Sequence, residues 1–274
     1  MSATPGNKTR RKASGGSYRA IAAYYDPEYA HYDWLAQDVP YFLERLKRDG
    51  RQRVLEVAVG TGRAGIPLAQ AGHRVLGVDY DPDVLEIARR KRDAVGLGDR
   101  ELELVRGDAT ALELDAPRFD WACILFNTFL NFTTLERQDA VLQGVRRHLK
   151  RGTGRLWLDV FNPNPALLAE DRSEGLDPFI FYVPEYERTV YKTTDVRREM
   201  GRQVQRVTFR YQWFDRDGVL HREQRAFELT FMFPRELQLL VERNGFELES
   251  LHGDYDASEV TARSPRLIAC CRAR

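Results

Sequence analysis

The sequence predicts an α/β fold built on a mostly parallel sheet with helices on both faces. Between residues 53 and 161, short apolar runs typical of buried strands alternate with longer amphipathic patterns typical of helices. The strand-like runs are apolar along their whole length, as in parallel strands that are covered on both faces. The repeated strand–helix order also provides the crossover connections that parallel strands require.

Each expected element follows from this alternation. Strands are expected at residues 53–57, 74–78, 102–105, 121–126 and 155–161, and helices at residues 62–71, 82–94 and 135–149. Near the C-terminus, Pro234 begins a helical pattern and Gly245 follows it, which is the usual helix punctuation. Two further strands, at residues 246–253 and 266–271, bring the expected sheet to seven strands.

The strand–helix alternation stops at residue 162, where two Asn-Pro pairs follow one another. Residues 162–232 then read as strands, and the clearest hairpin pairs residues 203–214 with residues 219–233 around a left-handed Gly218. That register places four residues opposite four others on one face: Val207, Phe209, Tyr211 and Trp213 opposite Phe227, Arg225, Glu223 and His221. The insertion is either a half-buried sheet with a solvated far end or a lid over an active site.

The chain divides into five expected segments. A basic tail, with Lys8, Arg10, Arg11 and Lys12, covers residues 1–17 and is expected to be disordered. A helical cap follows at residues 18–50, the cofactor-binding core at residues 51–161, and the antiparallel lid at residues 162–232. Residues 233–274 are expected to complete the core sheet.

The composition indicates a soluble globular protein, since 43% of the 274 residues are hydrophobic and 30% are charged. No apolar run is long enough for a membrane helix, so we expect a cytoplasmic location and no membrane partner. Lys and Arg (42) nearly balance Asp and Glu (41), which leaves no global field to hold nucleic acid.

The three cysteines predict buried free thiols. Cys123 lies in an apolar run, and Cys270 and Cys271 are adjacent near the C-terminus. Their spacing suits neither a zinc site nor a disulfide framework. No other metal-ligand spacing is present in the sequence, so no metal is expected.

A glycine-rich turn carries the strongest functional signal. Gly60, Gly62 and Gly65 lie between the first strand and its helix, where a ligand approaches the backbone and meets helix N–H groups. Asp79 closes the next strand, where its carboxylate can accept hydrogen bonds from ribose hydroxyls. Both a nicotinamide dinucleotide and S-adenosylmethionine fit this pattern.

Three features favour S-adenosylmethionine. Glu56, in the first strand, suits a cationic methionyl group and is unfavourable beside a pyrophosphate. Asp108, between Gly107 and Ala109 after the third strand, can accept from an adenine amino group. The late insertion, helix and strand pair have no counterpart in a simple dinucleotide domain.

Residues 53–161 resemble the class I methyltransferase core. Glu56-x-Ala58-x-Gly60-x-Gly62 corresponds to its first motif, with Ala58 where the first glycine usually stands, and Gly77-Val78-Asp79 corresponds to its second motif. Gly107-Asp108-Ala109 corresponds to its adenine-contacting motif. The resemblance implies a Rossmann-like seven-stranded methyltransferase fold, mostly parallel with an antiparallel last strand, and S-adenosyl-L-methionine as the cofactor.

A narrower resemblance covers most of the chain. The tyrosine-rich segment 24–29 and the loop 126–132 are similar to segments of glycine N-methyltransferases and deoxyamino-sugar N,N-dimethyltransferases. The insertion and the ending Gly253-Asp254-Tyr255-Asp256 through Ser264-Pro265-Arg266 also match that group. The resemblance implies a small-molecule substrate and an N-terminal segment that folds over the cofactor. Asn131 stands where the amino-sugar enzymes carry a histidine, which weakens that specific assignment.

The expected cofactor contacts follow from these motifs. Gly60 and Gly62 hold the methionyl backbone, Asp79 the ribose and Asp108 the adenine. Tyr25, ahead of Tyr24 and Tyr29, is expected to close the pocket, with helix-face packing as the alternative for each tyrosine. The full expected set is Tyr25, Glu56, Ala58, Gly60, Gly62, Asp79, Tyr80, Asp108, Ala109 and Phe126.

The candidate catalytic residues are less constrained. They are Asn127 and Asn131 in the loop and His221 in the hairpin, with Glu223 and Arg225 beside His221. His31 and His252 are further candidates for a base, and Arg188 or Arg225 for binding a substrate carboxylate or phosphate. For each of these four residues the alternative is an ordinary structural or solvent-exposed role.

The expected function is methyl transfer to a nitrogen or oxygen atom of a small polar molecule by in-line displacement. The alternatives are a protein or RNA methyltransferase on the same fold, a nicotinamide oxidoreductase and a non-enzymatic S-adenosylmethionine sensor. The expected partner is the small-molecule substrate. A homo-oligomer is expected on the resemblance alone.

Overall fold

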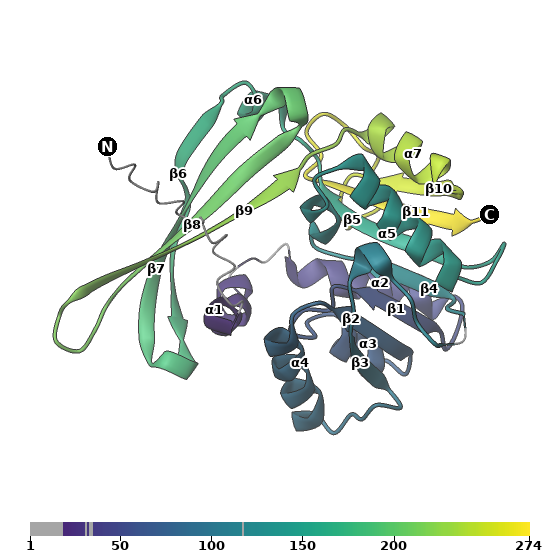
Figure 1. Ribbon diagram of the computed structural model, residues 1–274, viewed down its shortest axis with the longest axis horizontal. Helices are drawn as coiled ribbons and strands as arrows, with labels where there is room; N and C mark the ends of the chain where they lie inside the picture. Colours follow the sequence, from purple (N-terminus) through teal and green to yellow (C-terminus); the bar gives the residue numbers. More distant parts are fainter. Residues whose placement is uncertain (1–18, 31, 33–34, 117) are drawn as a thin grey trace, which may run out of the picture.

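The larger of two sheets in the described residues has seven strands (Figure 1). The computed structural model describes residues 19–30, 32, 35–116 and 118–274. The strand order is β10-β11-β5-β4-β1-β2-β3. The bounds are β1 Arg53–Val57, β2 Arg74–Asp79, β3 Leu102–Arg106, β4 Trp121–Ile124, β5 Arg155–Phe161, β10 Phe246–His252 and β11 Arg266–Ala273.

The strand directions confirm the predicted fold class. β1 pairs in parallel with β2 and β4, β2 with β3, and β4 with β5. The last strand, β11, is antiparallel to both of its neighbours, β5 and β10. The late strand pair therefore completes the seven-stranded sheet as expected.

Helices cover both faces of this sheet because its strands are apolar on both faces. Leu55 and Leu158 belong to the cluster on one face, which α5 (Leu135–His148) and α7 (Pro234–Arg243) cover. Trp121 and Trp157 belong to the cluster on the other face. That face is covered by α2 Asp38–Lys47, α3 Gly65–Gln70 and α4 Pro82–Ala94.

Local capping sets the helix boundaries. The Asp81 side chain accepts from the Asp83 backbone N–H at 2.9 Å and caps α4, with Pro82 at its first position. Pro234 begins α7, and Gly245, with φ +82°, follows its end as predicted. The remaining short helical elements are η1 Leu35–Gln37, η2 Ala109–Ala111, η3 Thr128–Asn131, α6 Pro165–Leu168, η4 Pro184–Tyr186 and η5 Met200–Arg202.

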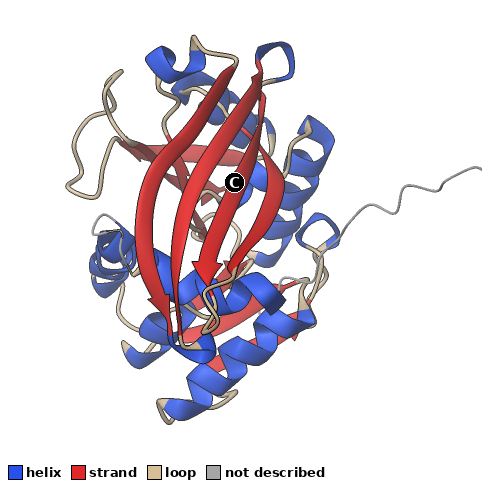
Figure 2. Cartoon of the chain, turned by 90° about the vertical axis from the view of Figure 1, so that its left-hand side faces the viewer, coloured by secondary structure: helices blue, strands red, loops and turns tan. Residues whose placement is uncertain are grey.

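The insertion forms a separate antiparallel sheet, β6-β7-β8-β9 (Figure 2). We call it the lid sheet. Its strands are β6 Arg172–Val183, β7 Arg188–Glu199, β8 Val204–Phe214 and β9 Leu220–Thr230.

The predicted hairpin register is confirmed. Val207 pairs with Phe227, and Trp213 pairs with His221 six residues further along β8. Gly218 in the connecting loop has φ +76°, as the turn requires. The residues on the face that carries Val207 and Phe227 are buried or half-buried, because this face is turned toward the rest of the molecule.

Helix α1 (Arg19–Tyr29) lies between the lid sheet and α4 (Figure 1). Tyr24 packs on Phe181 of β6, with ring centroids 6.3 Å apart. On its other side, Asp26 forms an ion pair with Lys91 of α4 at 2.8 Å. The expected basic tail, residues 1–17, lies outside the described residues.

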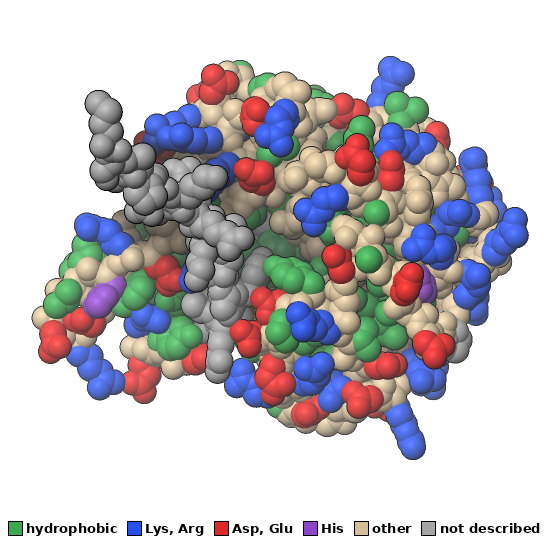
Figure 3. All heavy atoms as spheres, in the orientation of Figure 1, with side chains coloured by type: hydrophobic (Ala, Val, Ile, Leu, Met, Phe, Trp, Pro, Cys, Tyr) green, Lys and Arg blue, Asp and Glu red, His purple; other side chains and the backbone are tan. Residues whose placement is uncertain are grey.

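Two further expectations concern burial and surface charge. Cys123, Cys270 and Cys271 are free and buried, as predicted. On the face shown in Figure 3, acidic and basic side chains are intermixed. No helix in the described part of the chain is long and apolar enough to cross a membrane.

Gly77 is expected to be intolerant of a side chain because β2 passes under Val59. A Cβ added at Gly77 comes within 2.7 Å of Val59 Cγ2, whereas one added at Gly98 comes no nearer than 3.6 Å to the Glu101 side chain. Gly77→Ala should lower the free energy of unfolding by about 1–3 kcal/mol, and Gly98→Ala should change it by less than about 0.5 kcal/mol. Urea unfolding measures both, and equal stability of the two variants contradicts the prediction.

Candidate functional site

A cavity of about 440 Å³ lies at the carboxyl ends of β1, β2 and β3. Ligands of open α/β sheets bind at this edge, where loops leave consecutive parallel strands. The glycine turn, the ends of β2 and β3, helix α1 and the loop after β4 line it, together with single residues of α4, α5 and the lid sheet. Expected cofactor residues that line it are Tyr25, Ala58, Gly60, Asp79, Tyr80, Asp108 and Ala109.

The glycine turn brings the backbone against the cavity. Ala58 and Gly60 line it, with φ 58° and 56°, in the left-handed region that glycine adopts without strain. Gly62, at φ +80°, shapes the turn but is not among the lining residues. A Cβ at Gly62 comes within 3.0 Å of Ile66, so this glycine allows close packing on α3.

Asp79 ends β2 with its carboxylate held by two backbone N–H groups. Oδ2 accepts from Gly60 N and Oδ1 from Asp81 N, each at 3.0 Å. The side chain is 8% exposed, and burial raises its pKa against the opposing effect of these bonds. The carboxylate is thus fixed in orientation at the cavity wall. Tyr80 beside it lines the cavity and is 63% exposed.

Asp108 caps the short helix η2 at the end of β3. Its Oδ1 accepts from the backbone N–H and the hydroxyl of Thr110, at 2.8 and 2.7 Å, and these bonds hold its pKa below the usual value. Both bonds use Oδ1, so Oδ2 is available to a ligand in the cavity.

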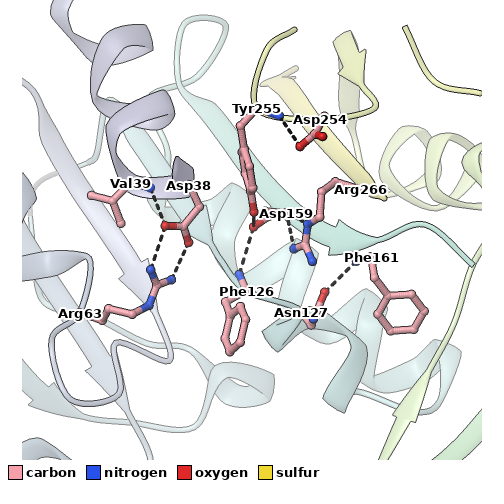
Figure 4. Close-up of polar contacts among 10 residues, drawn as sticks. All are labelled: Asp38, Val39, Arg63, Phe126, Asn127, Asp159, Phe161, Asp254, Tyr255 and Arg266. Carbon is pink, nitrogen blue, oxygen red and sulfur yellow. Dashed lines mark hydrogen bonds and ion pairs between the residues drawn. The ribbon is translucent and has the colours of Figure 1, made fainter. Parts of the chain in front are cut away.

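Glu56 is buried in β1 beneath the glycine turn. It is 5% exposed, and its Oε2 has no hydrogen-bond partner among the described residues. Burial raises its pKa to about 8, although the nearby Arg63 guanidinium opposes the shift. Arg63 itself donates two hydrogen bonds to Asp38, at 2.8 and 2.6 Å (Figure 4). Glu56 is not among the residues that line the cavity, but a buried carboxyl with one unbonded oxygen is suited to a cationic ligand group.

The loop after β4 has an unusual backbone. Phe126 and Asn127 both have positive φ, 53° and 62°, which is strained for residues other than glycine. Asn127 Oδ1 accepts from the Phe161 backbone N–H at 2.7 Å (Figure 4). This bond ties the loop to β5, so Asn127, a candidate catalytic residue, has its side-chain oxygen engaged in the fold and does not line the cavity.

Asn131 does line the cavity, together with Thr128 and Phe132 of the same loop. Its amide Nδ2 donates to the Thr128 carbonyl at 3.1 Å, which orients the side chain. Phe126, expected to contact the cofactor, is not among the lining residues and instead packs on Tyr29 with ring centroids 4.7 Å apart.

A buried polar network behind this loop was not predicted. Asp159 of β5 is fully buried and accepts from Arg266 Nε at 2.9 Å and from the Tyr255 hydroxyl at 3.0 Å (Figure 4). Its Oδ2 also accepts from Phe126 N at 3.4 Å, and its carbonyl accepts from Asn127 N at 3.0 Å. The sequence signals that point to it are a carboxylate and an arginine inside apolar strands.

Helix α1 contributes Tyr25 to the cavity, as expected. Asp26 next to it accepts from the Thr61 hydroxyl at 2.9 Å, and Thr61 also lines the cavity. Tyr24 is buried against the lid sheet, and Tyr29 packs on Tyr25 at 4.2 Å between ring centroids. Tyr24 therefore has the alternative role considered for these tyrosines, because it packs from one face of the helix and does not line the cavity. His31 lies outside the described residues.

Several polar candidates lie elsewhere. His221 stacks on Trp213 near the hairpin turn, with its Nε2 2.7 Å from Asp215, and does not line the cavity. The hairpin register places it six residues along the strand from Phe227, which does line the cavity. His252 Nδ1 lies 2.7 Å from the Tyr41 hydroxyl, and neither residue lines the cavity.

The arginine candidates also lie off the cavity. Arg225 forms an ion pair with Glu223 at 2.5 Å, and the Arg188 guanidinium lies 4.3 Å from the centroid of the Trp213 ring. Lining residues that the sequence reasoning missed are Thr61, Val78, Asp81, Val84, Gly107, Thr128, Phe132, Arg137 and Phe227. Most of them belong to segments next to predicted site residues, but Phe227 reaches the cavity through the fold of the lid sheet.

Comparison with known proteins gives consistent matches. The methyltransferase domain family model matches residues 54–152. The chain is similar to the cypemycin N-terminal methyltransferase of Streptomyces sp, with 30% identity over 220 residues, covering 80% of this chain and 82% of that protein.

Solved structures share the fold over nearly the whole chain. The CcbJ methyltransferase from Streptomyces caelestis has a TM-score of 0.75 at 22% identity, covering 94% of this chain and 97% of that chain. The amino pentose methyltransferase CalS10 from Micromonospora echinaspora, solved with S-adenosylmethionine bound, has a TM-score of 0.68 at 20% identity, covering 93% and 97%.

The cavity fits S-adenosylmethionine. Asp79 is oriented to accept from ribose hydroxyls, and Asp108 Oδ2 is available to an amino group. The unpartnered Oε2 of Glu56 suits the cofactor's ammonium group. These residues would hold and orient the cofactor, which would supply an electrophilic methyl group on a sulfonium.

Removing the Asp79 carboxylate should weaken cofactor binding by about 10- to 100-fold, because a charged hydrogen-bond acceptor is lost in a buried wall. Calorimetric titration of Asp79→Ala with S-adenosylmethionine measures the loss. Asp99→Asn is the matched control, since Asp99 pairs with Arg92 at the surface away from the cavity. NAD⁺ should not bind either protein. Unchanged affinity in Asp79→Ala would sink the assignment of the ribose site.

Glu56 should make cofactor binding proton-linked. Its pKa is raised from 4.5 to about 8 without ligand, so the carboxyl is protonated at pH 7, and a bound ammonium group favours its ionised form. Binding at pH 7 should therefore release a proton, seen as a binding enthalpy that depends on the buffer's ionisation enthalpy. Glu56→Gln should abolish that dependence, and a buffer-independent enthalpy in the wild-type protein contradicts the prediction.

The same shift predicts how stability changes with pH. The pKa of Glu56 is higher in the folded state than its unfolded value of 4.5, so protonation of Glu56 favours the folded state. This stabilisation is complete below pH 4.5 and is lost as the pH rises to about 8. Without cofactor, the stability of the wild type relative to Glu56→Gln should therefore fall over this window.

Family membership rests on the sequence match over four-fifths of the chain and on the shared fold. The cavity is lined by the residues predicted from the motifs of the same family, Asp79 and Asp108 among them. The chain belongs to the class I S-adenosylmethionine-dependent methyltransferases.

Proposed function

We propose that this methyltransferase acts on an amine nitrogen of a small polar molecule. The nitrogen lone pair forms a bond to the methyl carbon while the carbon–sulfur bond breaks, leaving S-adenosylhomocysteine. The methylated ammonium then loses a proton to solvent. The protein's contribution is to align the amine with the methyl group and to exclude water, and alignment supplies about 7–11 kcal/mol of the barrier.

The absence of a general base at the substrate end of the cavity is the observation that carries the proposal. We assign Thr128, Asn131, Phe132 and Phe227 to the substrate, because they come from the loop after β4 and the lid sheet. Among the described residues lining the cavity none is histidine, cysteine, lysine or glutamate, and its tyrosines, Tyr25 and Tyr80, are among the expected cofactor contacts. The lining aspartates all belong to the cofactor side, at residues 79, 81 and 108. A hydroxyl acceptor needs a base to remove its proton, whereas an amine reacts as its neutral form.

Asn131 is the candidate residue for orienting the amine. Because its Nδ2 donates to the Thr128 carbonyl, its Oδ1 is left as an acceptor. An acceptor at this place can take an N–H of the amine and direct the lone pair toward the methyl group. In this proposal, Asn131 positions the substrate and moves no proton.

The names of similar proteins support nitrogen as the acceptor. The relative at 30% identity is called an N-terminal methyltransferase, and CalS10 is an amino pentose methyltransferase. The name of the 30% identical relative, an N-terminal methyltransferase, also favours a second class of acceptor, the terminal α-amine of a short peptide.

A panel of matched acceptors tests the proposal. Purified protein and S-adenosylmethionine are incubated with amino sugars, amino acids and short peptides, each paired with an analogue in which hydroxyl replaces the amine, and mass spectrometry detects added methyl groups. Amines should be methylated and their hydroxyl analogues should not. The logarithm of kcat/KM should rise with slope one below the amine's pKa, because the neutral amine reacts.

Asn131→Ala should lower kcat/KM for the best amine by about 10- to 100-fold while the affinity for S-adenosylhomocysteine stays within about twofold. The matched surface control is Asn164→Ala, because Asn164 caps the short α6 and does not line the cavity. Methylation of the hydroxyl analogues in preference to the amines would overturn the proposal.

A further inference from the structure

We propose that Lys192 of the lid sheet is a positioning residue for the cofactor, acting through a buried ion pair with Glu28 that holds Tyr25 at the cavity. The inference needs the family's cofactor only, so it does not depend on the acceptor proposed above. It assigns to the lid sheet a part in cofactor binding, in addition to any contact with substrate.

Helix α1 presents two faces to two partners. Residues four apart lie on one face of a helix. Tyr24 and Glu28 form one such pair, and both contact the lid sheet, Tyr24 through Tyr211 at 5.1 Å between ring centroids. Tyr25 and Tyr29 form the next pair, and Tyr25 lines the cofactor cavity. A shift of the first face on the lid sheet therefore moves Tyr25.

The contact between α1 and the lid sheet is fully buried. Glu28 is 1% exposed, Lys192 2% and Tyr211 less than 1%. Lys192 Nζ forms an ion pair with Glu28 Oε1, and the Tyr211 hydroxyl donates to Glu28 Oε2 at 2.8 Å. Both oxygens of one carboxylate are thus satisfied by β7 and β8.

Among the described residues, Lys192 forms one ion pair, with Glu28, and otherwise lies against aromatic rings. Its Nζ lies 3.7 Å from the centroid of the Phe209 ring and 5.2 Å from that of Phe179. Burial lowers the pKa of Lys192, and the Glu28 carboxylate opposes that shift. A buried charge that loses its partner is strongly unfavourable. The pair therefore allows few positions of α1 relative to the lid sheet.

On the side of the core, α1 is attached by the packing of Tyr29 on Phe126, with ring centroids 4.7 Å apart, and by polar contacts of Asp26. Asp26 pairs with Lys91 at 2.8 Å, and their side chains are 38% and 36% exposed. Solvent screens an ion pair at this exposure. Asp26 also accepts from Thr61 of the glycine turn at 2.9 Å, which brings α1 over the cofactor but only through a hydroxyl. Of these two ion pairs of α1, the one with the lid sheet is therefore the one shielded from solvent.

A double-mutant cycle in cofactor affinity tests this inference. S-adenosylhomocysteine is titrated into the wild type, Lys192→Met, Tyr25→Ala and the double variant, with melting temperature measured for each. Lys192→Met should weaken binding by about tenfold. Because Lys192 acts through Tyr25, the double variant should bind no more weakly than Tyr25→Ala alone.

Two further variants keep the result interpretable. Arg210→Met breaks an ion pair with Asp195 in the same sheet. Both residues alternate to the opposite face of the strands from Lys192 and Tyr211, so this variant should leave the affinity within about twofold. If Lys192→Met does not fold, Tyr211→Phe removes one hydrogen bond to Glu28 and keeps the ring, and it should weaken binding by about threefold. The inference is overturned if Lys192→Met folds and binds with wild-type affinity. If Lys192→Met does not fold, wild-type affinity in Tyr211→Phe overturns it. The inference is also overturned if the affinity losses of Lys192→Met and Tyr25→Ala add fully in the double variant, or if Arg210→Met loses as much affinity as Lys192→Met.

Discussion

The buried carboxylate of Asp159 is the interaction on which the arrangement of the site depends most. It lies in the central part of the seven-stranded sheet and is completely enclosed, so each of its lone pairs needs a donor. Arg266 of the last strand and Tyr255 of the preceding loop supply two donors, and the backbone of the loop after β4 supplies another. One charge therefore ties the C-terminal strand to the loop beside the cavity, and the strained backbone at Phe126 and Asn127 is held there.

Helix α1 links the two sheets of the molecule, which also pack directly on each other through Val196, Val207 and Leu229 of the lid sheet. One face of this helix is joined to the lid sheet by buried contacts, and the other carries Tyr25 to the cavity that the seven-stranded sheet forms. The lid sheet reaches the same cavity directly through Phe227. The core, α1 and the lid sheet therefore all contribute residues to the lining of the cavity, and its shape depends on how these three parts pack together.

Local patterns in the sequence predicted much of the fold and of the cofactor cradle. The seven strands follow from apolar runs, and the hairpin pairing from the alternation of side chains around Gly218, because both are set by neighbouring residues. Asp79 and Asp108 were predicted as site residues because each follows a parallel strand, and the carboxyl ends of such strands share one edge. His221 was predicted because the hairpin register aligns it with Trp213, and Asn127 because its loop resembles an active-site loop of related enzymes. The structure places His221 near a hairpin turn and engages Asn127 in a backbone bond. The segment boundaries and the roles of the site residues stay predictions.

The sequence by itself determined the fold class, the family and the turn that approaches the cofactor, because these are encoded in periodicity and in closely spaced glycines and carboxylates. Only the tertiary structure decided which distant charges meet. Lys192 lies 164 residues from Glu28, and Arg266 lies 107 residues from Asp159. Nothing local distinguishes such residues from solvated ones, since a buried charge is stable only when the fold brings its partner to it.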